Sequence, residues 1–174
     1  MRRFSLVLCF VATTLGAQQP DTVRKDSSRT DSSPPTPAQA RYLDGLRTVG
    51  RGIAQLKDGI DRVVRAYGVK DSVKLAQAGR RLGGLCATAH AFMGPGRTRM
   101  TATAYDDSVR AHARKLSLQI DSVIGYMPTC QHTAFRTPAK TAADVLGLIR
   151  SYEGALRTFR TDIGLNHAPA LPSQ

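Results

Sequence analysis

Four stretches of the chain carry aliphatic residues at alternating steps of three and four, and this spacing constrains the fold more than any other feature. On an α-helix it forms one apolar stripe, and a period near 3.5 is typical of helices that cross with a left-handed twist. The four stripes are Tyr42, Leu46, Val49, Ile53, Leu56, Ile60, Val63 and Tyr67; Leu75, Ala78, Leu82, Leu85, Ala89 and Phe92; Val109, Ala113, Leu116, Ile120, Val123 and Met127; and Ala142, Val145, Ile149, Tyr152, Leu156, Phe159 and Ile163. The chain has no Trp, so Leu, Ile, Val and Ala must build the core. The pattern predicts an all-α, up-down-up-down four-helix bundle, left-handed, over residues 37–164.

The first and fourth predicted helices carry the same start signal, a threonine followed by a proline. Thr36 precedes Pro37, and Thr137 precedes Pro138. Threonine caps the free N–H groups of a helix start, and proline is favoured at the first helical position. Gly68 is predicted to end the first helix as a left-handed cap, and Gly164 the fourth.

The second and third helices have less regular boundaries. The second is predicted to start at Asp71 or Ser72 and to stop at the Gly94-Pro95-Gly96 sequence. The third is predicted to start near Thr103 and to end at Gly125 or just before Pro128. Three short connections are therefore expected.

Small residues recur beside two of the stripes. Gly45, Gly52 and Gly59 are seven residues apart in the first helix, and Ala66 continues the row. Glycine costs a helix about 1 kcal/mol relative to alanine, so such a row indicates that another group approaches closely. The second helix has a comparable run, Ala76, Gly79, Gly83 and Ala87. We expect these two helices to pack closely against each other; a flat ligand lying along the row is the alternative.

The N-terminal residues follow the layout of a secretory signal peptide. Arg2 and Arg3 precede the apolar residues 4–15, and Gly16 and Ala17 offer a cleavage point. The sequence predicts export to the periplasm or the extracellular space, with residues 1–17 removed. Residues 18–36, rich in Ser, Thr, Pro and Asp, are expected to form a disordered linker, and residues 165–174 a flexible tail.

Two cysteines remain after the predicted cleavage, Cys86 and Cys130, and an oxidising compartment favours a disulfide between them. In a simple bundle Cys86 would lie roughly 20 Å from the third connection, whereas disulfide Cα atoms approach within about 7 Å. The bridge therefore requires residues 126–130 to fold back over the second helix. Otherwise the second helix is broken at Gly83-Gly84, or the cysteines pair between two chains.

A metal site is the alternative use of the same cysteines. Cys86, His90, Cys130 and His132 would form a Cys2His2 set, and a fifth side chain, Met93, would suit copper. Non-covalent haem, with a ligand such as His112, also stays open. No cofactor motif is present: the sequence lacks Cys-x-x-Cys-His and Gly-x-Ser-x-Gly, and the single glutamate cannot supply a usual di-iron site. We therefore expect no cofactor.

The formal net charge is +12, which favours an anionic partner. Arg97 and Arg99 follow the glycines of the predicted second connection, which would then be a basic loop able to hold a phosphate or sulfate. The other candidate anion-binding residues are Arg80, Arg81, Arg110 and Arg114. A GC-rich coding bias, with Arg in place of Lys and Asp in place of Glu, would also explain the charge. No aromatic residues alternate with these cations, so no specific nucleic-acid partner is expected.

The prediction for function is a non-enzymatic binding or structural module of the cell envelope. A basic face would contact an anionic envelope component or an acidic protein. The alternative is a metal- or haem-binding periplasmic bundle that uses the Cys and His ligands. The apolar run of the signal peptide is shorter than the ~20 residues that span a bilayer, and no later run is longer, so no transmembrane segment is expected. The oligomeric state is left open.

Overall fold

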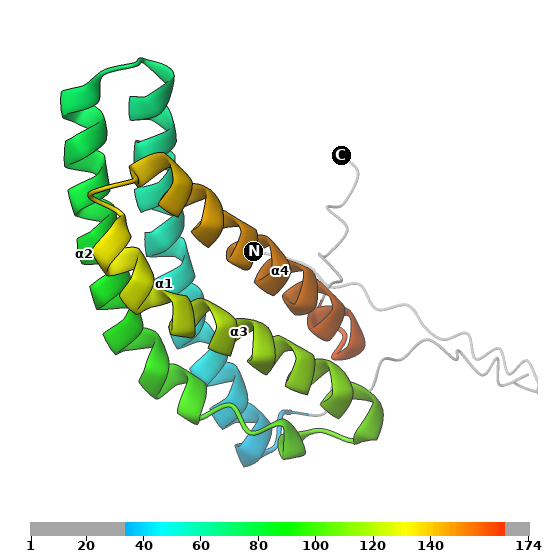
Figure 1. Cartoon of the computed structure of the whole chain (residues 1–174). Helices are drawn as coiled ribbons and strands as arrows, with labels where there is room; N and C mark the ends of the chain where they lie inside the picture. Colours follow the sequence, from blue (N-terminus) through cyan, green and yellow to red (C-terminus); the bar gives the residue numbers. More distant parts are fainter. Residues whose placement is uncertain (1–33, 166–174) are drawn as a thin grey trace, which may run out of the picture. The chain divides into compact units, whose positions relative to one another are not determined.

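The structure is a computed structural model that describes residues 34–165, and within this range it is entirely helical and has no strand. The four α-helices are α1 (Pro37–Gly68), α2 (Ser72–Thr98), α3 (Asp107–Thr133) and α4 (Pro138–Asp162), and a 3-10 helix, η1 (Ala102–Ala104), precedes α3 (Figure 1). The prediction of four helices and no strands is thus confirmed for the described residues. The predicted signal peptide and nearly all of the predicted linker and of the predicted tail lie outside them.

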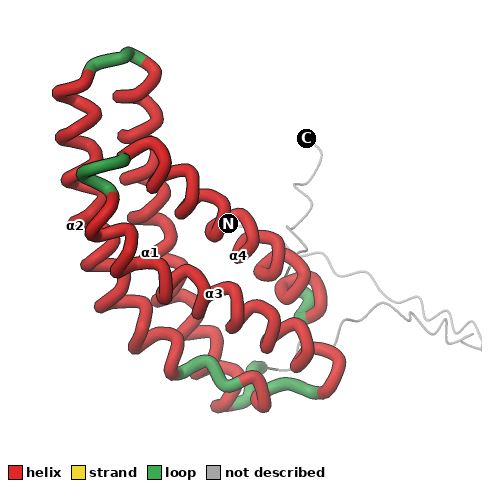
Figure 2. Tube along the Cα trace, in the orientation of Figure 1, coloured by secondary structure: helices red, strands yellow, loops and turns green. Residues whose placement is uncertain are grey.

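Short connections join the helices in two pairs (Figure 2). Residues 69–71 link α1 to α2, and residues 134–137 link α3 to α4. The first reversal uses a left-handed residue, but this is Lys70, with φ 54°, and not the predicted Gly68. Gly164 does adopt a positive φ, of 72°, directly after α4. In Figure 1 the α3–α4 pair lies at an angle to the α1–α2 pair, and the α1–α2 turn extends past the α3–α4 connection.

Helix starts follow the sequence signals. The side chain of Thr36 accepts a hydrogen bond from the N–H of Gln39, and the Gln39 side chain accepts one from the N–H of Thr36, which completes a capping box. The carboxylate of Asp71 caps α2 by accepting from the N–H of Lys74, and that of Asp106 caps α3 by accepting from the N–H of Val109, each without a reciprocal bond. Thr137 occupies the N-cap position of α4 without a side-chain capping bond. The predicted start of the third helix near Thr103 falls in η1 instead.

Two predicted helix ends are wrong because helices continue through prolines. α2 runs through Pro95 to Thr98, and α3 runs through Pro128 to Thr133. Proline inside a helix costs about 3 kcal/mol, so packing must offset it. Here each extra segment is buried on one side: Gly96 against α1, and Cys130 against α2.

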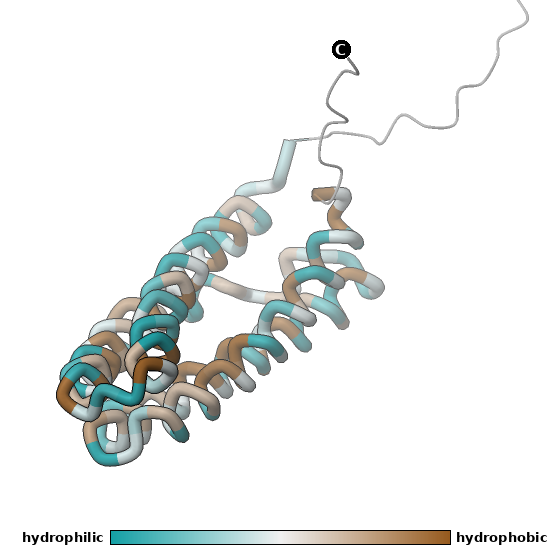
Figure 3. The backbone as a smooth tube through the Cα atoms, turned by 90° about the horizontal axis from the view of Figure 1, so that it is seen from above, coloured by the Kyte–Doolittle hydropathy of each residue, from teal (hydrophilic) through white to brown (hydrophobic). Residues whose placement is uncertain are grey.

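All four predicted stripes contribute to one hydrophobic core, and apolar and polar positions alternate along the helices in Figure 3. Three predicted stripe residues lie outside this core. In α2, Leu85 is only half-buried and the neighbouring Cys86 is fully buried. In α2, Phe92 is 39% exposed and Met93 is fully buried in its place. At 100° per residue, Met93 is in phase with Leu75 and Leu82 whereas Phe92 is rotated away from them. In α1, Tyr67 is 62% exposed, because it lies at the α1–α2 turn beyond the α3–α4 pair (Figure 1).

The glycine row of α1 packs against α2 as predicted. A Cβ added to Gly45 would lie 2.4 Å from the carbonyl oxygen of Gly96, and one added to Gly52 would lie 2.4 Å from Cγ of Met93. Two glycines of the predicted small-residue run in α2, however, do not face α1. Gly79 and Gly83 lie against the end of α3 and the connection to α4, where added Cβ atoms would meet the carbonyl oxygens of Ala134 and Gln131. At Gly45, Gly52 and Gly59 the row of α1 is filled by α2, so it leaves no slot for a flat ligand there.

Three aromatic rings, Tyr42, Tyr105 and Phe159, pack together with centroids 5.2–5.3 Å apart. The hydroxyl of Tyr42 donates to the carbonyl of Ala113 over 3.2 Å, and the ring is fully buried. Burial is the main cause that raises the pKa of Tyr42 to about 12.

The raised pKa of Tyr42 predicts that the free energy of unfolding falls at alkaline pH. The folded state holds the phenol proton more tightly than the unfolded state, whose pKa is about 10. The contribution of protonated Tyr42 to the free energy of unfolding is therefore complete below about pH 10. It is lost as the pH rises from about 10 to about 12, by an amount on the order of 2 kcal/mol. Urea unfolding of the wild type and of Tyr42→Phe over this pH range measures it. The variant should show a shallower decline, and equal slopes would contradict the assignment to Tyr42.

Candidate basic binding site

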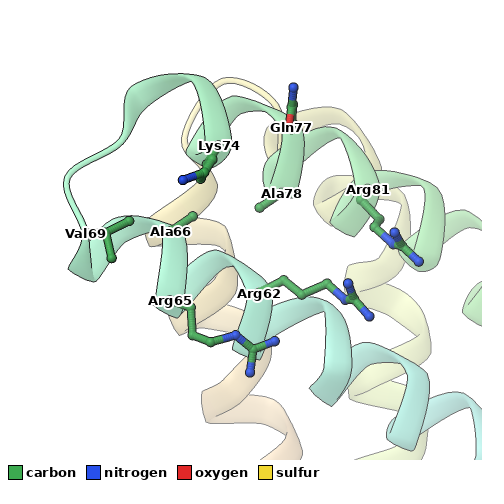
Figure 4. A pocket seen from close by; sticks show the side chains of 8 residues that line it. All are labelled: Arg62, Arg65, Ala66, Val69, Lys74, Gln77, Ala78 and Arg81. Atoms are coloured by element: carbon green, nitrogen blue, oxygen red, sulfur yellow. The ribbon is translucent and has the colours of Figure 1, made fainter.

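A basic hollow lies at the α1–α2 turn, between the last turns of α1 and the first turns of α2 (Figure 4). Its volume is about 550 Å³. Its lining combines cations with small and apolar residues: Arg62, Arg65, Ala66, Val69, Lys74, Gln77, Ala78 and Arg81. We call this the basic hollow.

The antiparallel pairing of α1 and α2 brings the lining residues together. On α1, Arg62, Arg65 and Ala66 share a face at spacings of three and four, and on α2 Lys74, Ala78 and Arg81 do the same. In Figure 4 the methyl groups of Ala66 and Ala78 point toward each other between the helices, and they form a small, buried floor. The guanidinium groups of Arg62 and Arg81 extend from opposite helices toward the same side.

Two of the four cations in the basic hollow are already paired. Nε of Arg62 lies 2.9 Å from Oδ2 of Asp58, and Nζ of Lys74 lies 3.2 Å from Oδ2 of Asp71. Arg65 and Arg81 form no ion pair with any carboxylate in the part of the chain that the structure describes. These two guanidiniums can therefore receive an external anion without breaking a contact within the protein.

The pKa of Asp58 shows that the cations around the basic hollow favour a negative charge. The hydrogen bond from Arg62 and the charges of Arg62, Arg81 and Arg65 lower the pKa of this carboxyl below its usual value. Three guanidiniums thus act on one anionic position. Guanidinium groups bind phosphate, sulfate and carboxylate oxygens through paired N–H donors, so the arrangement suits recognition of such groups.

The arginines singled out in the sequence lie in several places. Arg81 lines the basic hollow, whereas Arg97 is about 24 Å further along α2 at 1.5 Å per residue. Arg97 pairs with Asp121 at 2.8 Å, and Arg99 pairs with Asp44 at 2.6 Å. The prediction of a basic loop at residues 94–99 is wrong, because residues 94–98 are helical and both arginines form ion pairs with carboxylates.

The remaining predicted cations are scattered. Arg110 pairs with Asp107 at 2.7 Å at the start of α3. Arg80 contributes to a second, shallow hollow beside Phe135, and Arg114 is exposed on α3. The six predicted arginines therefore do not gather around one small anion.

Cys86 and Cys130 are joined in a disulfide, with Cα atoms 6.0 Å apart. Both are fully buried, and both lie within helices. The expected fold-back of residues 126–130 is wrong: α3 instead continues past Pro128, and its inclination to α2 brings its last turns to the middle of α2 (Figure 1). Neither a break at Gly83-Gly84 nor pairing between two chains is needed.

The alternative metal ligands are not assembled in the structure. His90 and His132 are exposed, and Cys86 and Cys130 are bonded to each other. Among residues 34–165 no group of three or more His, Cys, Asp or Glu side chains is placed to hold a metal ion. Met93 is buried against Gly52, and His112 contacts Asp162.

Three cations of the basic hollow, Arg62, Arg65 and Lys74, were not predicted as binding residues from the sequence. The pattern that could have identified them is the presence of cations both in the last turns of one helix and in the first turns of the next. A hairpin with a three-residue turn must place such residues opposite each other.

No protein-family model, curated protein or solved structure matches this chain significantly. None of the helices between residues 34 and 165 has the length and apolar character needed to cross a membrane.

Proposed function

We propose that this protein is an exported, non-enzymatic module of the cell envelope that binds anionic partners through the basic hollow. Export would follow from the predicted signal peptide, and the mature chain would fold as a left-handed, up-down-up-down bundle. A buried disulfide joining α2 to α3 supports the oxidising compartment, because such bonds persist mainly outside the cytosol.

The observation that carries the proposal is the state of Arg65 and Arg81. Both line one hollow, both are free of ion pairs within the described residues, and the field they share with Arg62 already favours a carboxylate at Asp58. Most other arginines of the predicted basic face are neutralised by Asp44, Asp107 or Asp121. An added anion should therefore gain more binding free energy at the basic hollow than beside the paired arginines.

Removal of the two unpaired guanidiniums should weaken anion binding. In a titration with long-chain polyphosphate, Arg65→Gln/Arg81→Gln should lower the affinity roughly tenfold, since an exposed charge contact contributes up to about 1 kcal/mol. The affinity of the wild type should fall steeply as salt rises from about 50 to about 200 mM, because added salt screens contacts with phosphate groups. Arg150→Gln, at an exposed cation on α4, is the matched control.

Removal of the competing carboxylate should have the opposite effect. Asp58→Asn releases Arg62 from its ion pair and should raise the affinity for polyphosphate by about threefold. Binding that is insensitive to salt, or an equal loss in the double variant and in Arg150→Gln, would overturn the proposal.

A further inference from the structure

Exposed apolar side chains concentrate at the α1–α2 turn. Eight large apolar residues are exposed in the part of the chain that the structure describes, and four of them fall between residues 64 and 73. These four are Val64, Tyr67, Val69 and Val73, with exposures of 56–66%. Isolated exposed apolar residues are ordinary, but such a concentration at one end of a hairpin marks an interaction surface.

Cations surround these apolar residues. Over residues 58–81 the chain carries six cations and three carboxylates, and two of the carboxylates are held in ion pairs by Arg62 and Lys74. The cations are Arg62, Arg65, Lys70, Lys74, Arg80 and Arg81, and the carboxylates are Asp58, Asp61 and Asp71. The turn therefore presents apolar side chains within a net positive field.

The apolar residues do not share one concave pocket. Val69 lines the basic hollow, whereas Tyr67 lines a separate hollow with Lys70 and Leu75. The turn between them is only three residues long and lies at the free end of the hairpin (Figure 1). A groove partner would contact one side alone, but a flat surface that meets the end of the hairpin contacts both.

We propose that the α1–α2 turn docks end-on against a bilayer that contains anionic lipid. Val64, Tyr67, Val69 and Val73 enter the headgroup region, and the cations of the turn contact lipid phosphates. Apolar side chains flanked by Lys and Arg are the combination that binds this interface. The inference rests on the proposed function, since it identifies the partner of the basic hollow as a lipid surface. It requires no helix that spans the membrane.

A fluorescence reporter tests the docking directly, because the chain contains no tryptophan. Tyr67→Trp places a single indole at the turn, and Leu118→Trp, at a residue of α3 that is 64% exposed, is the control. With vesicles of phosphatidylglycerol and phosphatidylcholine, the emission of Tyr67→Trp should shift to shorter wavelength, and that of Leu118→Trp should stay unchanged. Vesicles of phosphatidylcholine alone should shift neither.

Cosedimentation with the same vesicles separates the apolar from the ionic contribution. Val64→Ser/Val73→Ser, at two exposed residues that do not line the basic hollow, should weaken vesicle binding about tenfold, as expected for the loss of partly buried methyl groups. It should leave polyphosphate binding unchanged. Arg65→Gln/Arg81→Gln should weaken polyphosphate binding about tenfold but vesicle binding only about fivefold, because Arg65 lies one turn from the end of α1 whereas Arg81 lies about 15 Å along α2 from the α1–α2 turn. Leu118→Ser is the matched control for the loss of an exposed apolar side chain.

The outcomes distinguish the two proposals. If the wild type binds polyphosphate through Arg65 and Arg81 but does not sediment with anionic vesicles, the docking proposal is overturned and the anion site stands. An acidic protein or a free phosphate would then be the partner. If vesicles bind while the emission of Tyr67→Trp does not shift, another surface is responsible and the inference fails. If neither ligand binds, both proposals fall.

Discussion

Replacement of both Cys86 and Cys130 by alanine is expected to lower the free energy of unfolding by about 4 kcal/mol. The two cysteines are 44 residues apart in sequence, so their bond closes a long loop and restricts the unfolded chain strongly. Alanine suits both sites, since each is fully buried and a serine would leave a hydroxyl without a partner there. Urea unfolding monitored by circular dichroism measures the difference between the variant and the oxidised wild type.

The reduced wild type is the natural control for this experiment. Treatment with a thiol reductant under mildly denaturing conditions should bring its unfolding midpoint close to that of the double alanine variant. A loss below about 1 kcal/mol in the variant would contradict the prediction, because the chain-entropy contribution alone exceeds that value.

Gly45→Ala is expected to destabilise the protein by about 2–3 kcal/mol, the usual range for forcing an atom into a well-packed contact. The added Cβ would lie 2.4 Å from the carbonyl oxygen of Gly96 and 2.9 Å from Cγ of Met100. The carbonyl belongs to the backbone of α2, so the contact is relieved only by separating the helices. Melting temperature and urea midpoint should both fall.

Gly50→Ala is a matched control in the same helix with the opposite expected sign. A Cβ at Gly50 meets no atom within 4 Å, so the substitution adds helix propensity without a clash. It should stabilise the protein by up to about 1 kcal/mol. If the two variants shift stability in the same direction, close approach of α1 and α2 at Gly45 is wrong.

The helical segments could be predicted from the sequence because their evidence is local. The apolar spacing and the Thr-Pro starts depend only on residues within a few turns, and they placed the starts of α1, α2 and α4 correctly. Helix ends at proline were predicted wrongly. Pro95 and Pro128 disfavour a helix locally, but burial of the turns around them, a long-range contribution, outweighs that cost.

The difference between local patterns and long-range contacts also explains the wrong predictions at the candidate site. Arg97 and Arg99 are predicted to lie in one glycine-rich loop, yet their ion-pair partners Asp121 and Asp44 are far away in sequence. Conversely, Arg65 and Arg81 are separated by sixteen positions and become neighbours only when the hairpin closes. The pairing of Cys86 with Cys130 was predicted, but the way in which the two cysteines meet was not. It depends on the inclination of α3 to α2, which no local sequence pattern encodes.

The bond between α2 and α3 also determines how the chain would respond to a protease. Residues 99–106, which include η1, form the longest link between α-helices in the described range, and Cys86 and Cys130 lie on opposite sides of it in sequence. A single cut in this link yields two fragments that stay covalently attached until a reductant is added. Nicked and intact molecules would therefore migrate together on a non-reducing gel and separate only on a reducing one.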